Sequence, residues 1–364
     1  IKFGAQYTDH TFRPSVSSMY VAAAEDTFSE KIDTTLGDAD IFSKELCVYA
    51  EDNWSATDWL KINFGARYAA YFVSGKTYHS LEPRLSVRAL LGPDLSFKAS
   101  YSEMSQFLHL LSNTSLSLPT DLWVPVTKRI APMRSRQAAA GLFYSKGGFD
   151  LSAEGYWKTM DNVMEYRDGA SFLGSTTGWE DKVALGKGWA YGEELLVQKK
   201  FGKVSGWVGY TWSRTMRLFD RPGAMINSGH PFPAKYDRRH DISIVATYKF
   251  SERFDASATW VFSTGNAMTL GMQRYQGIEP DNLGILNSIT YIESRNNYRM
   301  PNYHRMDVSV NFNRTLKHGE RTLNISIYNV YNHKNPYMLY TSGNKLMQLS
   351  IFQIIPSVSY AYKF

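Results

Sequence analysis

Apolar and polar residues alternate with a period of two along most of this chain. In "LKINFGARY" (Leu60 to Tyr68) the even-numbered positions are Leu, Ile, Phe, Ala and Tyr, and Lys, Asn, Gly and Arg stand between them. The segments "LSFKASYS", "FDASATWVF" and "MDVSVNFN" repeat the alternation. It predicts β-strands with one apolar and one polar face. Half-buried strands of soluble proteins usually keep it for about five residues, whereas several segments here are longer.

The length of these segments indicates strands that cross a membrane, because a tilted strand needs about 9 to 11 residues to span the bilayer. Aromatic residues such as Trp59, Tyr71 and Tyr101 stand near segment ends, where interfacial girdles are expected. We therefore predict an all-β fold, a transmembrane antiparallel up-and-down β-barrel with about 14 strands. These strands are expected at residues 1–9, 42–54, 58–72, 79–91, 94–105, 134–146, 148–166, 187–201, 203–217, 237–250, 252–267, 301–315, 320–340 and 345–364.

The connections between these segments fall into two classes. Six are short turns with the sequences "NWSAT", "LGPD", "KGG", "FGK", "FSER" and "KHGE". Most of the intervening connections are long, including residues 10–41, 106–133, 167–186, 218–236 and 268–300. Alternation of short turns with long loops is typical of outer-membrane barrels, which carry tight periplasmic turns and long extracellular loops.

The charged residues of the strands are assigned to the lumen, since a charge facing lipid costs about 2 to 4 kcal/mol at mid-membrane. Glu193 breaks this rule, because it shares the face of Tyr191, Leu195 and Val197. The mixture of both signs favours a wall that holds a folded plug over a charge-selective passive pore; neutralisation among neighbouring strands is the alternative. The residues predicted to face the lumen or a plug are Arg67, Glu82, Arg84, Arg88, Lys98, Glu154, Arg239 and Asp241.

Composition excludes several other classes. The net charge of +6 is spread along the chain, which argues against nucleic acid as a partner. Cys47 is the only cysteine, so no intrachain disulfide can form, and the sequence has no CxxC or Cys/His zinc pattern. We predict no metal site and no cofactor. No apolar run approaches the roughly 18 to 20 residues of a membrane-spanning helix.

Several segments together resemble one known family. "SLEPRLSVRALLGPDLSFKASYSEMSQFLHLL", "AYGEELLVQKKFGKVSGWVGYTWSRT", "FPAKYDRRHDISIVATYKF", "YHRMDVSVNF", "LNISIYNVYNHKNPY" and "IIPSVSYAYKF" are similar to the barrels of TonB-dependent receptors, Bacteroidetes type. The resemblance covers nearly the whole chain. It implies that residues 1–364 are the last 14 strands of a 22-stranded plugged barrel, and that the N-terminal plug domain and Ton box have no counterpart in these residues.

The resemblance also implies a function and a location. We expect an outer-membrane receptor of a Gram-negative bacterium that takes up a scarce solute (siderophore, haem, vitamin, glycan or peptide) with energy delivered by TonB through the missing plug. The expected partners are outer-membrane lipid and lipopolysaccharide, a surface lipoprotein, and the barrel-assembly machinery, which would bind the closing strand that ends on Phe364. A self-contained 14-stranded passive channel or porin is the alternative.

The candidate solute-binding residues lie in the long connections. Loop 106–133 is rich in Leu, Val and Pro, and Trp123, Lys128 and Arg129 are predicted to line a substrate vestibule or a docking face for a lipoprotein lid. Alternatively, the loop folds back into the barrel mouth. Trp179 is a candidate for stacking on sugars or porphyrins. His109 and His230, with His10 and His79, could meet above the lumen to bind iron or haem, but four scattered histidines without ligand spacing are more often solvated loop residues.

The segment "YDRRHD" invites a catalytic interpretation that strand geometry disfavours. Alternation separates Asp237, Arg239 and Asp241 from Arg238 and His240, whereas a catalytic histidine needs its carboxylate within hydrogen-bond reach. A phospholipase-type barrel would need Ser and His aligned on one face, and no predicted strand shows both at matching depth. We therefore predict that the protein is not an enzyme and that Arg238 and His240 point toward the lipid headgroups.

Overall fold

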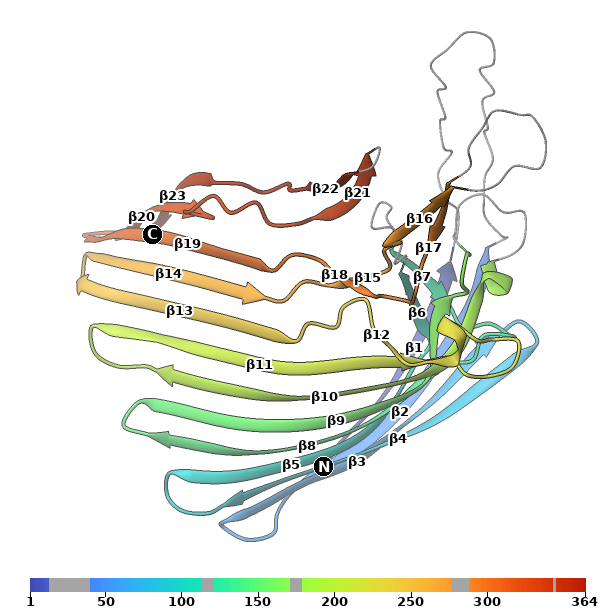
Figure 1. The fold of residues 1–364 in the computed structure, drawn as a ribbon. Coiled ribbons are helices and arrows are strands. Elements are labelled where there is room, and N and C mark those ends of the chain that lie inside the picture. Colours follow the sequence, from blue (N-terminus) through green and yellow to red (C-terminus); the bar gives the residue numbers. More distant parts are fainter. Residues whose placement is uncertain (13–39, 113–120, 171–178, 277–287, 343–344) are drawn as a thin grey trace.

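The computed structural model describes residues 1–12, 40–112, 121–170, 179–276, 288–342 and 345–364. Fourteen long strands form one antiparallel sheet in which neighbours follow each other in the chain (Figure 1). This confirms the predicted meander. The strands are β1 (Lys2–Phe12), β2 (Ile41–Ser55), β3 (Leu60–Val73), β4 (Lys76–Leu90), β5 (Leu95–Gln106), β8 (Met133–Lys146), β9 (Phe149–Tyr166), β10 (Val183–Lys199), β11 (Val204–Leu218), β13 (His240–Ser251), β14 (Phe254–Ser263), β19 (Tyr303–Leu316), β20 (Gly319–Tyr328) and β23 (Ile355–Lys363).

The register aligns like residues across the sheet. On β3 and β4, Phe64 stands opposite Leu85 and Ile62 opposite Val87, while Arg67 stands opposite Glu82 on the other face. Because side chains alternate along a strand, each such pair extends one apolar and one polar face over the whole sheet. The apolar face is uncovered: Leu81 is 66% exposed and Val358 is 68% exposed. An apolar surface of this extent suits contact with lipid.

All six predicted short turns lie at one end of the sheet, which we call the short-turn end (the left edge of Figure 1). They comprise residues 56–59, 91–94, 147–148, 200–203, 252–253 and 317–318. The opposite end, the loop end, carries the longer connections. One of its connections is short, since only Ser74 and Gly75 join β3 to β4, with Gly75 at a φ of 74°. That left-handed conformation costs least for glycine.

The last two predicted strands differ from the observed ones. The expected strands at 320–340 and 345–364 are each interrupted: β20 stops at Tyr328, and β23 begins at Ile355. Between them β21 (Met338–Ser342) and β22 (Lys345–Leu349) form a separate hairpin. The reason lies in "NVYN", where Asn329 and Asn332 adopt φ values of 52° and 53° that end the extended backbone.

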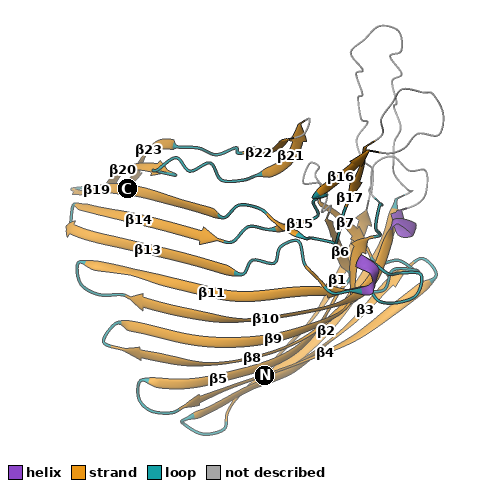
Figure 2. Ribbon diagram, in the orientation of Figure 1, coloured by secondary structure: helices purple, strands orange, loops and turns teal. Residues whose placement is uncertain are grey.

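Further short elements belong to the connections at the loop end (Figure 2). Their pairs are β6 (Leu108–Ser112) with β7 (Asp121–Pro125), β15 (Ala267–Met268) with β18 (Tyr298–Arg299), β16 (Gln273–Gln276) with β17 (Ser288–Tyr291), and β12 (Phe232–Pro233) with β11. Two 3-10 turns are η1 (Trp179–Lys182) and η2 (Asn227–Gly229). Among the described residues, no helix is long and apolar enough to cross a membrane.

The sheet is strongly curved and open in the described residues. Figure 1 shows a trough in which β1 and β23 are the two edges, and no ladder joins them. The polar face of the sheet is the one that the connection after β5 folds against. There, Phe107 stacks on Tyr71 with ring centroids 4.5 Å apart, and Val126, Cys47 and Ala69 complete the cluster. We call this polar face the inner face and the apolar one the outer face.

Candidate functional site

Four of the charged residues predicted to face the lumen, Arg88, Lys98, Glu154 and Asp241, stand in one row of register partners across the inner face. Arg88 stands opposite Lys98 on the next strand, and the row continues through Gly141. It then passes through Glu154, Glu194, Thr211 and Asp241. The row therefore carries cations on β4 and β5 and carboxylates on β9, β10 and β13. Lys98 Nζ also lies 3.7 Å from the centroid of the Phe143 ring.

A second charged group lies nearer the loop end. Arg67 donates from Nη1 to Glu82 Oε2 at 3.0 Å and from Nη2 to Glu45 Oε1 at 2.9 Å. Glu82 is 4% exposed and also accepts a hydrogen bond from the Ser105 amide. Arg84 lies 3.9 Å from Glu51. The buried Glu82 carboxylate is tolerated because the Arg67 guanidinium and the Ser105 amide both donate hydrogen bonds to it. Arg67 and Glu82 therefore face inward and also stabilise one another.

A hollow opens on the inner face between these groups and the short-turn end. Its volume is about 490 Å³, and its polar lining includes Lys61, Asn63, Arg88, Lys98 and Glu154. Both signs of charge and several hydrogen-bonding groups meet there, which suits a polar protein surface or water better than an apolar small molecule.

The predicted vestibule residues of loop 106–133 have different surroundings; residues 113–120 of this loop lie outside the described residues. Trp123 is 55% exposed, while its neighbour Val124 is fully buried. Lys128 is exposed. Arg129 is exposed too, and it pairs with Asp181 at 2.5 Å and Glu180 at 3.4 Å. Those carboxylates raise the pKa of Arg129, Asp181 more than Glu180. The loop is thereby fastened to η1.

Trp179 and His109 are both buried: Trp179 packs against this loop, and His109 lies within it. Trp179 is 5% exposed in a cluster with Leu111, Val124, Ile130, Met164, Tyr166 and Val183. His109 is 3% exposed, and its Nε2 lies 3.1 Å from the Ala131 carbonyl oxygen. Burial lowers the pKa of His109 to about 4, although the bond to Ala131 opposes the shift. Neither ring is accessible to a ligand, because both are buried where the β6–β7 hairpin packs against the rest of the loop end.

The four histidines considered for iron or haem have separate environments. His10 faces Glu45 at 3.6 Å, and His79 stands on the outer face with its Nδ1 2.7 Å from the Tyr68 hydroxyl. His230 is exposed and follows η2. In the part of the chain that the structure describes, no three His, Cys, Asp or Glu side chains are grouped to hold a metal ion.

Two buried carboxylates tie the connections together, and sequence reasoning did not single out either as a centre. Glu165 is 1% exposed and pairs with Arg217 and with Arg295, the latter at 3.3 Å. Arg295 also reaches Asp168 at 3.5 Å. This group joins the ends of β9 and β11 to the connection before β19. No local sequence pattern could indicate this ionic network, because Glu165 and Arg295 are 130 residues apart in the chain.

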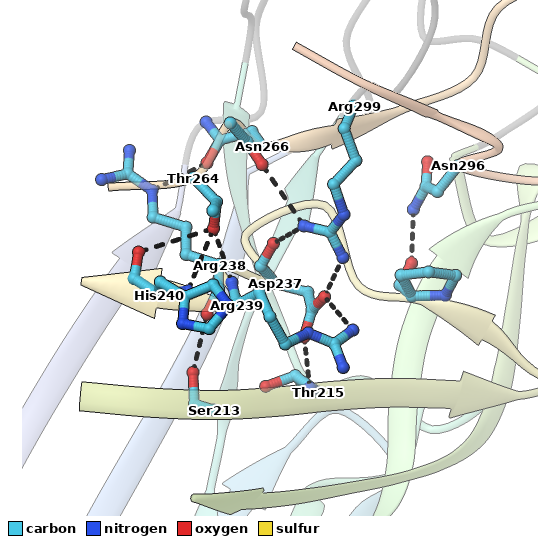
Figure 3. Close-up of polar contacts among 12 residues, drawn as sticks. Ser213, Thr215, Asp237, Arg238, Arg239, His240, Thr264, Asn266, Asn296 and Arg299 are labelled. Atoms are coloured by element: carbon cyan, nitrogen blue, oxygen red, sulfur yellow. Dashed lines mark hydrogen bonds and ion pairs between the residues drawn. The ribbon is translucent and has the colours of Figure 1, made fainter. Parts of the chain in front are cut away.

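The second of these buried carboxylates belongs to Asp237 in the "YDRRHD" segment (Figure 3). Its buried side chain accepts a hydrogen bond from the Thr215 amide at 2.5 Å and pairs with Arg299 and, at 3.5 Å, with Arg239. Because β13 begins only at His240, both Asp237 and Arg239 precede the strand. The strand expected from about residue 237 therefore begins at His240. The reason is that Asp237 forms hydrogen bonds and ion pairs with Thr215, Arg299 and Arg239 and does not join the β11–β13 ladder.

These fold and site features can be compared with known proteins. Residues 1–330 match the family described as "TonB dependent receptor-like, beta-barrel". The chain belongs to this family of TonB-dependent receptors. No curated protein matches the chain by sequence.

Solved structures of similar fold include three receptors. The ferric-catecholate import receptor Fiu of E. coli K12 is 13% identical, with a TM-score of 0.61 over 99% of this chain and 51% of that one. The ferripyoverdine receptor of the outer membrane of Pseudomonas aeruginosa is 14% identical, with a TM-score of 0.60 over 92% and 42%. The ferric yersiniabactin uptake receptor FyuA of Yersinia pestis is 12% identical, with a TM-score of 0.57 over 89% and 46%. At such identity the likeness concerns the fold alone, and this receptor-family chain spans about half the length of these proteins.

Proposed function

We propose that this chain forms the wall and the extracellular loops of an outer-membrane receptor that takes up a scarce solute with energy from TonB. Its family membership and its sheet, with short turns at one end and long connections at the other, support this function. A siderophore-type ligand is the first solute to test, because the similar solved structures are named for ferric siderophores. Haem, vitamin, glycan and peptide follow. The Bacteroidetes type of receptor is proposed on the quoted sequence segments.

The observation that carries the proposal is the inner row of opposite charges. Arg88 and Lys98 stand on one side of the row, and Glu154, Glu194 and Asp241 on the other. A folded plug domain has both signs on its own surface, so a wall divided in this way can hold it by ion pairs and hydrogen bonds. A plug outside residues 1–364, which would also carry the Ton box, is part of the proposal.

The solute-binding surface is proposed on the exposed residues of the loop end. Trp123 offers an uncovered aromatic face, with Lys128 and Arg129 nearby in sequence, and His230 is exposed on the connection after β11. Tyr275 and Tyr291, which are 54% and 49% exposed, add aromatic surface on the β16–β17 hairpin. Aromatic and cationic groups together suit an anionic ligand with flat rings, such as a ferric catecholate. A surface lipoprotein could dock on the same residues.

The test measures uptake by the full-length protein in a host that lacks its own siderophore receptors. Radiolabelled ferric siderophores would be supplied with TonB present, and again with TonB deleted. Uptake that requires TonB supports the proposal. Uptake or ion conductance that persists without TonB would instead favour the alternative, a 14-stranded passive channel. Trp123→Ala is expected to lower ligand affinity, whereas Trp59→Ala, at the short-turn end, serves as its control.

A further inference from the structure

The inner face changes in chemical character between the two halves of the sheet. On β11, β13, β14, β19, β20 and β23, which follow one another in Figure 1, one row of register partners carries a hydroxyl group on every strand. We call it the hydroxyl row. Its residues are Ser205, Thr247, Ser257, Ser309, Ser326 and Ser357. The row described above for the inner face of β4 to β13 instead carries Arg88, Lys98, Glu154, Glu194 and Asp241, and we call it the charged row.

Amide side chains next to the hydroxyl row bond to one another and to one carboxylate. Asn311 Nδ2 donates to Asp255 Oδ1 at 2.8 Å, and Asn313 Nδ2 donates to Asp255 Oδ2 at 2.9 Å. Asn324 Nδ2 in turn donates to Asn311 Oδ1 at 2.6 Å. Thr322 Oγ1 donates to Asn313 Oδ1 at 2.9 Å. Each oxygen of the Asp255 carboxylate therefore has a hydrogen-bond donor inside the wall.

Two inward-facing charges of β19, between the hydroxyl row and the loop end, are also paired within the wall. Arg305 Nε lies 3.0 Å from Asp307 Oδ2. Arg305 Nη1 donates to the hydroxyl oxygens of Tyr303 and Tyr328 at 3.0 and 2.7 Å, and the guanidinium lies 4.1 Å from the centroid of the Tyr328 ring. On these strands Asp255, Arg305 and Asp307 therefore do not need a second protein surface to satisfy them.

The charged row has no such partners of its own. In the part of the chain that the structure describes, Glu154, Glu194 and Asp241 form no ion pair, and Arg88 forms none either. Arg88 and Lys98 stand opposite each other, so like charges meet there. Such groups gain most from charges on a second surface, because charge-assisted hydrogen bonds are stronger than neutral ones. Neutral groups gain little, since they exchange bonds to water for equivalent bonds to protein.

We propose that the solute crosses the membrane along the hydroxyl row, on the inner face of β13, β14, β19, β20 and β23, while the charged row holds the plug. This inference rests on the proposed function and adds the side of the wall on which the route lies. The hydroxyl groups of Ser309, Ser326 and Ser357 form no side-chain hydrogen bond among the described residues, so they are available to a passing solute.

The chemistry of the hydroxyl row defines the class of solute that it suits. A hydroxyl group both donates and accepts hydrogen bonds, so the row matches a solute whose surface carries amide, carbonyl or hydroxyl groups. Each contact is neutral and therefore weak, and a solute must leave each contact in order to move on. The competing route is the hollow of about 490 Å³ beside Arg88 and Lys98, which Ser86 also lines. There, unpaired charges would retain a polar solute.

The experiment compares the two routes by cysteine substitution in the full-length protein. Ser309→Cys tests the hydroxyl row, and Ser86→Cys is the matched control in the hollow, since both serines are half-buried on the inner face. The buried Cys47 is replaced by alanine in each variant. Both are first checked for the heat-modifiable electrophoretic mobility of a folded barrel. Cells are then treated with a charged maleimide about as large as a ferric siderophore, which excludes entry through porins.

The rate of labelling is measured with and without the radiolabelled ferric siderophore of the uptake test, in hosts with TonB and with TonB deleted. With siderophore present, TonB is expected to accelerate labelling of Ser309→Cys about tenfold or more, because the rate follows the fraction of time for which the route is open. Labelling of Ser86→Cys should change less than about twofold by the same reasoning. Ser326→Cys repeats the test on the neighbouring strand and should behave as Ser309→Cys does.

Equal acceleration at both sites would overturn the proposal, because the plug would then leave the whole wall. Acceleration of Ser86→Cys alone would overturn it too, since the solute would then pass through the hollow. A third contrary result is TonB-dependent uptake with no acceleration of either Ser309→Cys or Ser326→Cys. These three results leave the proposed function intact. If the unchanged protein shows no TonB-dependent uptake, the proposed function fails, and this inference fails with it.

Discussion

Replacement of Asp237 by alanine should open the connections at the loop end. The carboxylate is fully buried and accepts hydrogen bonds from the Thr215 amide and from Arg299. An amide left without its acceptor in a buried position costs about 1 to 3 kcal/mol. The lost pair with Arg299 adds about 1 kcal/mol, a reduced value because the Arg299 side chain is 34% exposed and solvent screens it.

The sum is about 3 kcal/mol of local stability, which corresponds to an increase of about 150-fold in the opening equilibrium. Hydrogen–deuterium exchange of the amides around Thr215, in detergent micelles, measures this directly. Asp237→Asn keeps an oxygen acceptor for the amide and loses only the charge, so we expect about a fivefold increase. Asp220→Ala removes an exposed carboxylate from the connection after β11 and is the matched control, with less than a twofold change.

The result that would refute the reasoning is exchange in Asp237→Ala no faster than in Asp220→Ala. A second check is the double-variant cycle with Arg299→Met. If the carboxylate and the guanidinium stabilise one another, the two single effects will not add, and the coupling should exceed about 0.5 kcal/mol. Strict additivity would mean that the contact between Asp237 and Arg299 (Figure 3) contributes packing to the local stability and no ionic pairing.

Three further predictions follow from other parts of the chain. His109 is buried with its pKa lowered to about 4, so the unfolded hairpin binds a proton at a higher pH than the folded one does. Protection of residues 107–112 and 121–130 from proteolysis should be full above about pH 6.5 and fall between pH 6.5 and 4, a dependence that His109→Gln should flatten. Phe107→Ala removes the ring stacked on Tyr71 and should cost about 3 to 5 kcal/mol, measured as faster cleavage of the same loop, with the exposed Phe201→Ala as control. Gly206 has a φ of 153°, and a Cβ there would meet the Val245 carbonyl oxygen at 2.0 Å; Gly206→Ala should therefore reduce the folded, heat-modifiable fraction, whereas Gly92→Ala, with open space around it, should not.

The wall of the sheet could be predicted from sequence because its signal is local. The alternation around Leu60 to Tyr68 and the turn "LGPD" determine which face and which neighbour each strand has, with no distant partner needed. The same reasoning failed at "NVYN", where two asparagines with positive φ end β20 early. It also extended a strand into Asp237, because charged residues that form a buried ionic network cannot be distinguished by sequence from charged residues at the end of a strand.

The loop end could be predicted only in part, because its contacts join residues far apart in the chain. Loop 106–133 was expected either to bind a solute or to fold back into the mouth, and the structure shows the second behaviour for Val126, which packs on Tyr71. Trp123 remains exposed beside it. Trp179 is buried and Trp123 is exposed because η1 and β9 pack against the β6–β7 hairpin, and no local sequence pattern indicates that contact.

The order of the sheet has a consequence for how such a wall can be built and changed. Every ladder between long strands joins consecutive ones, so a hairpin can form from neighbouring residues as soon as both its strands are available. Growth is then stepwise, and an error of register in one hairpin is limited by the next strand that must match it. For the same reason, a whole hairpin can be gained or lost by duplication or deletion without rearranging the others. The number of strands in such a wall is therefore open to evolution in steps of two, while the loops at one end vary independently.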